Sequence, residues 1–129
     1  LGNHASVNAS GSTYVAYVFS EVAGYSKFGS WTAFGSTDGR FVFTGFRPAW
    51  VMAKQTTGGG GNWFMVDDKR SPFNIANDIL DANLNAAERN ADIFDFLSNG
   101  FKIRLGLGTG ETFIYLAFAE SPFKNARAR

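Results

Sequence analysis

Two groups of residues in the sequence are of types suited to binding a sugar. In the first, Trp31 precedes a glycine-bounded loop at 35–39 that contains Asp38, and Arg40 follows the loop. Sugars pack their C–H faces on aromatic rings, while carboxylate and guanidinium groups hydrogen-bond their hydroxyls. Loops on a rigid β scaffold carry recognition in many proteins. We therefore predict a ligand-binding site at Trp31, Asp38 and Arg40, with a core position for Trp31 as the alternative.

The second group surrounds Trp63. Asp67 and Arg70 follow it closely, and a run of four glycines at 58–61 comes just before it. The glycine loop is a candidate contact surface. We predict Trp63, Asp67 and Arg70 as a second ligand-binding set. The alternative for Trp63, as for Trp50, is a place in the hydrophobic core.

The sequence offers little support for catalysis. Its one histidine, His4, lies in a stretch rich in Ser, Asn and Gly, and no Gly-x-Ser-x-Gly elbow is present to hold a serine nucleophile. Pairs of carboxylates that could cleave a glycosidic bond arise by chance among eleven acidic residues. We predict no catalytic residues and no enzymatic activity. A glycan-degrading enzyme domain is kept as an alternative.

Two glutamates at the ends of predicted strands have a simpler explanation than catalysis. Glu21 has Lys27 nearby in the sequence, and Glu120 has Lys124. We expect these glutamates to cap strands or to pair with the two lysines.

Four aspartates are also close in sequence: Asp67, Asp68, Asp78 and Asp81. Carboxylate oxygens suit Ca²⁺, but their spacing matches no EF-hand loop and basic residues follow Asp68 directly. We predict no metal site and no cofactor.

Composition excludes several classes of protein. The 129-residue chain has a net charge of +1 and only 18% charged residues, so it lacks the basic face that nucleic-acid binding requires. No run approaches the roughly 20 apolar residues that cross a bilayer, and we expect no membrane insertion. The absence of cysteine excludes disulfides and thiolate zinc sites. With neither cross-links nor a large net charge, association is favoured, and we expect a homo-oligomer.

Aromatic strands separated by glycine turns are indicated by fourteen Phe and fifteen Gly. Strand patterns cover 13–20, 40–44, 49–55, 63–66, 93–97, 101–105 and 112–119. The glycine run 58–61 predicts one hairpin. Ser98-Asn99-Gly100 predicts another, with the type I′ turn that Asn-Gly favours. Residues 75–89 fit either a short helix or a strand followed by a loop.

The fold class follows from these strands. We predict an all-β antiparallel sandwich, of jelly-roll or concanavalin-A-like type, in a single domain over residues 1–124. Residues 125–129 form a short tail.

An internal echo is the most informative pattern. Residues 11–21 (GSTYVAYVFSE) match residues 110–120 (GETFIYLAFAE) at a constant offset of 99, with Gly, Thr, Phe and Glu identical at four positions. Chance likeness between two aromatic strands is one explanation. The other is a repeating unit of about 99 residues, in which residues 1–21 carry the closing strand of a preceding unit.

Several segments resemble a family found in tail-fibre-like proteins of tailed bacteriophages, particularly phages of marine bacteria. They are YVFSEVAGYSKFGS (17–30), DGRFVFTGFRPAWV (38–51), RSPFN (70–74), FLSNGFK (96–102) and YLAFAESPFK (115–124). The resemblance implies a concanavalin-A or laminin-G-like sandwich in a virion appendage associated with host attachment. It brings no catalytic residues with it.

We therefore expect a structural module of a phage tail fibre or other surface appendage, located in the virion, that binds a host receptor or glycan. Its expected partners are other virion proteins, a host surface glycan and further copies of itself, with a trimer expected on a fibre. A purely structural virion or capsid decoration protein is the first alternative, and the glycan-degrading enzyme domain is the second.

Overall fold

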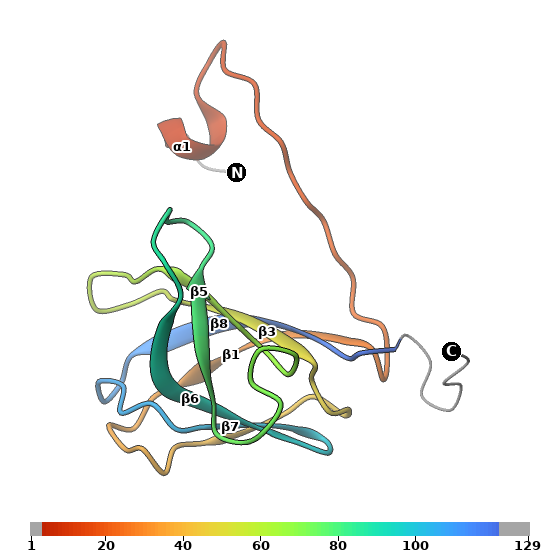
Figure 1. The fold of residues 1–129 in the computed structure, drawn as a ribbon. Helices are drawn as coiled ribbons and strands as arrows, with labels where there is room; N and C mark the ends of the chain where they lie inside the picture. The colour runs from red at the N-terminus through yellow and green to blue at the C-terminus, as the bar shows by residue number, and fades with distance from the viewer. Residues whose placement is uncertain (1–3, 122–129) are drawn as a thin grey trace.

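The computed structural model describes residues 4–121. Within them one short helix, α1 (Ala5–Asn8), precedes eight strands (Figure 1). The strands are β1 (Ser26–Thr32), β2 (Phe41–Phe43), β3 (Trp50–Gln55), β4 (Trp63–Asp67), β5 (Ala76–Asp81), β6 (Arg89–Leu97), β7 (Gly100–Ile103) and β8 (Thr112–Phe118). Neighbouring strands pair antiparallel in the order β1-β8-β3-β4-β5-β6-β7-β2. The predicted all-β antiparallel class is confirmed, and no helix of the described residues is long and apolar enough to cross a membrane.

Strand β5 joins the two layers of the sandwich. It pairs with β4 through Met65–Leu80 in the layer that also holds β3, β8 and β1. It pairs with β6 through Ala76–Phe94 in the layer that also holds β7 and β2. The register shifts between Ala76 and Asp78, and such an irregularity bends a strand. One strand therefore pairs with a neighbour in each layer.

The core lies between the layers because side chains alternate along each strand. In β3, Val51 and Ala53 are fully buried, while Met52 on the opposite face is half-buried. In β7, Phe101 and Ile103 are buried in the same way. This alternation is the one predicted for residues 49–55 and 101–105, and it gives one continuous hydrophobic cluster.

Residues 75–89 contain no helix, so the strand alternative is the correct one. They form β5, a loop and the start of β6. Ala76 and Ile79 are both fully buried, three residues apart, on either side of the register shift. The irregularity in the strand therefore produces the three-residue apolar spacing that resembles a helical pattern.

The hairpin between β6 and β7 is present, but its turn is not type I′. Leu97 pairs with Gly100, so the two loop residues are Ser98 and Asn99, and neither has a positive φ. A type I′ turn needs positive φ at both of its central residues. Gly100 begins β7 instead, where a Cβ would collide with the carbonyl oxygen of Val42. The close approach of β2, not the turn, requires this glycine.

Residues 13–20 pair with no strand in the described part of the chain, so the predicted strand is absent from this sandwich. They form an extended segment that leaves the body near β1 and runs to α1 (Figure 1). Val15, Tyr17 and Val18 are 79%, 82% and 90% exposed. The strand pattern is present in the sequence, but this domain supplies no neighbour to pair with it.

Gly100→Ala is expected to lower the free energy of unfolding by roughly 1–3 kcal/mol or more, because the added methyl group collides with the backbone of β2. Urea unfolding monitored by tryptophan fluorescence measures the loss. Gly61→Ala is the matched control, since its Cβ would meet only the Gln55 side chain, at 3.5 Å, without a positive φ. Equal stability of the two variants would contradict the close approach at Gly100.

Candidate functional site

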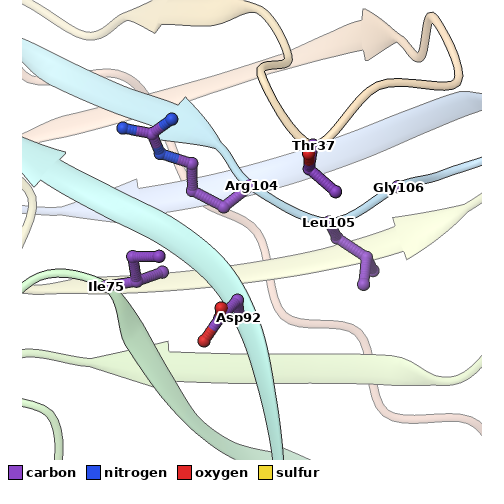
Figure 2. A pocket seen from close by; sticks show the side chains of 6 residues that line it. All are labelled: Thr37, Ile75, Asp92, Arg104, Leu105 and Gly106. Carbon is purple, nitrogen blue, oxygen red and sulfur yellow. The ribbon is translucent and has the colours of Figure 1, made fainter.

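An open pocket of about 430 Å³ is the candidate ligand-binding site (Figure 2). It is lined by Thr37 from the β1–β2 loop, Ile75 just before β5, Asp92 of β6, and Arg104, Leu105 and Gly106 after β7. In Figure 2, Ile75 and Asp92 lie on one side of the pocket and Thr37, Leu105 and Gly106 on the other. Four segments far apart in the sequence therefore build one site.

Arg104 is held in place by carboxylates. Its Nε donates to Oδ2 of the buried Asp95 at 2.6 Å, and its second terminal nitrogen lies 2.5 Å from the same oxygen. Its other terminal nitrogen donates to Asp38 at 3.3 Å. The hydrogen bond from Lys102, together with the nearby positive charges, lowers the pKa of Asp38. These charge-assisted contacts with two carboxylates orient the guanidinium before any ligand arrives.

The other pocket residues supply complementary chemistry. The side chain of the exposed Asp92 makes no hydrogen bond or ion pair within residues 4–121, so its carboxylate is open to accept from a ligand. Thr37 offers a hydroxyl that donates and accepts. Ile75 and the half-buried Leu105 provide an apolar surface. Apolar walls with a few placed polar groups are the usual composition of a small-molecule site.

The first predicted set is only partly at the surface. Trp31 is 5% exposed, and its ring stacks on that of Phe113 with centroids 5.1 Å apart, so the core alternative describes it. Asp38 is exposed and reaches the pocket through Arg104. The Arg40 guanidinium lies 3.8 Å from the ring centroid of Phe34, the exposed aromatic residue of this loop that sequence reasoning missed. The structure therefore brings Asp38, but not the Trp31 ring, to the candidate site.

The second predicted set is separated along β4. Trp63 is half-buried at the start of the strand, where it pairs with Lys54, and Asp67 is at its end. Four residues of strand span about 13 Å, so these two side chains do not form one sugar-sized contact. Asp67 and Arg70 form an ion pair of 2.6 Å instead. A ligand role for Trp63, Asp67 and Arg70 stays a prediction.

The pocket residues themselves escaped sequence reasoning. Asp92 is one of eleven acidic residues and stands in no distinctive pattern, and Thr37, Ile75 and Leu105 carry no motif. The one local signal was Arg104, a basic residue alternating with apolar ones in the strand pattern at 101–105. Its link to Asp95 depends on the β6–β7 register, which the sequence does not state.

The aspartates considered for calcium are engaged by protein groups. Arg47 donates to Asp68 at 2.7 Å, and Arg89 donates to Asp81 at 2.9 Å. Asp78 accepts from Ser71 at 2.9 Å. Over residues 4–121, no group of three His, Cys, Asp or Glu side chains could hold a metal ion.

The two glutamates at strand ends differ in their partners. Glu21 pairs with Lys27 at 2.8 Å, as predicted. Glu120 pairs with Lys69 at 3.1 Å, and Lys124 lies outside the described residues, as does the predicted tail at 125–129.

The fold and the pocket together define an all-β sandwich module with an open polar site between its loops. The chain belongs to the family described as domain of unknown function DUF7483, whose profile matches residues 1–122. No curated protein and no solved structure matches the chain. The matched range includes both copies of the echo, at 11–21 and at 110–120.

Asp67→Asn is expected to lower the free energy of unfolding by about 1.5–3 kcal/mol at pH 7, the usual contribution of a hydrogen bond to a charged group. Burial acts to raise the pKa of Asp67, but the hydrogen bonds from Arg70 and from the Lys69 amide outweigh it and lower the pKa. A lowered folded-state pKa stabilises the protein above the unfolded value near 4, and this stabilisation is lost as the pH falls through the folded value.

Urea unfolding at pH 7, 5 and 3 tests this linkage, with Asp92→Asn as the unpartnered control. The Asp67→Asn deficit should shrink towards zero at the lowest pH, whereas the control should match the wild type throughout. A deficit of the same size at every pH would mean that the charge of Asp67 is not its source.

Trp31→Ala is expected to cost about 3–5 kcal/mol of unfolding free energy, because it empties the centre of the core. Trp63→Ala should cost less than half of that, since its ring is only half-buried. Thermal unfolding of the two variants compares them directly. Equal losses would show that Trp31 does not hold the layers together.

Proposed function

We propose that this chain is a structural module of a virion appendage of the phage tail-fibre type that binds a carbohydrate on the host surface. The pocket at Thr37, Asp92 and Arg104 is the proposed site, and it is the observation that carries the binding role. The assignment to a virion, with other virion proteins and further copies of the chain as partners and a trimer on a fibre, rests on the sequence resemblance.

The chemistry of the pocket supports a polyhydroxylated ligand. The Asp92 carboxylate accepts hydrogen bonds, Arg104 donates them, and both are charged groups that a sugar hydroxyl pairs with well. The apolar side chains of Ile75 and Leu105 suit the C–H face of a sugar ring. Because Asp95 already fixes Arg104, less conformational freedom is lost on binding. Each contact is weak alone, and several copies on one particle would multiply its strength.

A binding role fits the pocket better than hydrolysis does. Glycoside hydrolysis uses two carboxylates on opposite sides of the scissile bond. Asp92 is the open carboxylate among the pocket-lining residues, while the nearby Asp95 is buried in its ion pair with Arg104. We therefore propose that the ligand is held and released unchanged.

A purely structural role is the second candidate, and a different observation favours it. The outer face of the β1-β8-β3-β4 layer carries partly exposed apolar side chains, among them Met52, Met65 and Ile114. Such a face is typical of a surface that contacts neighbouring proteins.

Asp92→Ala is expected to weaken binding to host surface glycans at least tenfold without lowering the melting temperature, because the side chain has no partner within the described residues. A glycan array probed with the protein multimerised on streptavidin measures the change. Asn85→Ala, an exposed substitution in the loop before β6, is the control and should bind as the wild type does.

Two outcomes would overturn different parts of the proposal. A blank array and no adsorption to host cells, with a folded multimeric sample, would remove the receptor-binding role and leave the structural one. Binding that survives Asp92→Ala but is lost in Trp63→Ala would move the site to the β4 surface.

A further inference from the structure

The extended segment before β1 carries a strand pattern that its own domain does not use. No backbone–backbone hydrogen bond reaches residues 13–20 from any described residue. Their side chains are mostly aromatic or aliphatic and are largely exposed. Unpaired backbone beside apolar side chains is a template for pairing with a further strand. The segment therefore has the properties of a strand that belongs to another sheet.

The echo identifies which strand it matches. Gly11 corresponds to Gly110, and both adopt a positive φ, +77° and +85°, in a turn that leads into extended backbone. Neither glycine has an atom within 4 Å of its Cβ position, so local crowding does not force this conformation. The likeness between 11–21 and 110–120 thus extends from sequence to backbone. The segment therefore corresponds to β8 and to the turn before it.

Strand β8 is a central strand, with β1 on one side and β3 on the other. Its inward side chains Phe113, Tyr115 and Ala117 are buried in the core, while Leu116 on its outer face is half-buried. The outer face of β8 is apolar as well, and its Ile114 is 37% exposed. At an offset of 99, the corresponding inward residues of the segment are Tyr14, Ala16 and Val18.

The outward positions of the segment are apolar as well, at Val15, Tyr17 and Phe19. In β8 the outward positions Ile114, Leu116 and Phe118 are apolar too, so the segment matches β8 on both faces. An exposed sheet edge favours charged or interrupted strands instead.

The end of the segment is fixed to this domain. Glu21 accepts from Lys27 at 2.8 Å and from the Phe28 amide at 3.2 Å. The Phe19 ring lies 6.2 Å from that of Phe28 and 6.0 Å from that of Phe118. We call these contacts of Phe19 and Glu21 the junction contacts. They hold one end of the segment against the sandwich while the rest extends away from it (Figure 1).

We propose that residues 11–21 are the eighth strand of a second module of this fold, inserted between the strands equivalent to β1 and β3. The acceptor is a preceding module in a tandem array. A second copy of this chain is a poorer acceptor, because its own β8 fills that place. The junction contacts then set the position of one module against the next. The inference concerns assembly and does not depend on carbohydrate binding.

A tandem protein tests the proposal. It consists of residues 22–109 followed directly by residues 11–129, so that the first unit lacks its own β8 and has only residues 11–21 to replace it. We expect slow amide hydrogen exchange in the strands of both units, measured by mass spectrometry. A control tandem, with residues 110–120 in place of 11–21, should show the same protection.

Two substitutions sharpen the test. Val18→Asp corresponds to the fully buried Ala117, so in the tandem it should abolish protection of the first unit only. Val15→Thr corresponds to the outward-facing Ile114 and should leave both units protected. In the single 129-residue chain, Val18→Asp should leave the melting temperature unchanged, because Val18 is exposed there.

Three results would overturn the proposal. The first is an unprotected first unit in the tandem. The second is protection that does not respond to Val18→Asp. The third is concentration-dependent dimerisation of the single chain that Val18→Asp abolishes, which would assign the segment to a second copy of the chain.

Discussion

The packing of aromatic rings between two layers is the interaction on which this structure depends. Trp31 of β1 stacks on Phe113 in its own layer and meets the rings of Phe94 and Phe101 from the opposite layer edge-on, at 6.1 Å and 5.8 Å. With no cysteine in the chain, no covalent link assists this contact. Its indole Nε1 is buried without a hydrogen-bond partner in the described residues, at a cost of about 1–3 kcal/mol. The burial of four rings outweighs that cost.

The same strands that complete the core also position the candidate site. β6 and β7 send Phe94 and Phe101 inward, while Asp95 and Lys102 pair on the other side of the ladder. Arg104 continues from β7 and is held by Asp95. Asp92 comes from β6 itself, while the other five lining residues come from the connections that precede β2 and β5 and follow β7.

Much of the fold could be predicted from the sequence because side-chain alternation matches burial wherever strands are regular. β3 and β7 are examples, since their inward residues are those with the predicted period. The prediction was uncertain at 75–89 because the irregularity in β5 shifts the period from two to three. At Gly100 the sequence predicted the wrong turn type. This glycine is required by the close approach of the β2 backbone, a contact that no local pattern encodes.

The candidate site was less accessible to prediction. Trp31 has the residue type of a sugar-binding ring, but whether a ring is exposed depends on which layer faces it. The pocket residues come from four segments whose proximity follows from strand order and register. Asp38 was found because it is charged and lies in a glycine-bounded loop, and those features are visible in the sequence.

The points at which the polypeptide enters and leaves the sandwich have a mechanical consequence. Ser26, at the start of β1, pairs with Phe118, at the end of β8, so the polypeptide enters and leaves the sandwich on adjacent antiparallel strands at one corner. Tension on both ends would open the β1–β8 ladder one residue pair at a time, instead of shearing its seven pairs together. A thread of such domains would be compliant and would lengthen stepwise under load. The ion pair of Glu21 and the ring of Phe19 lie at the corner where that opening begins, so their contacts must break first.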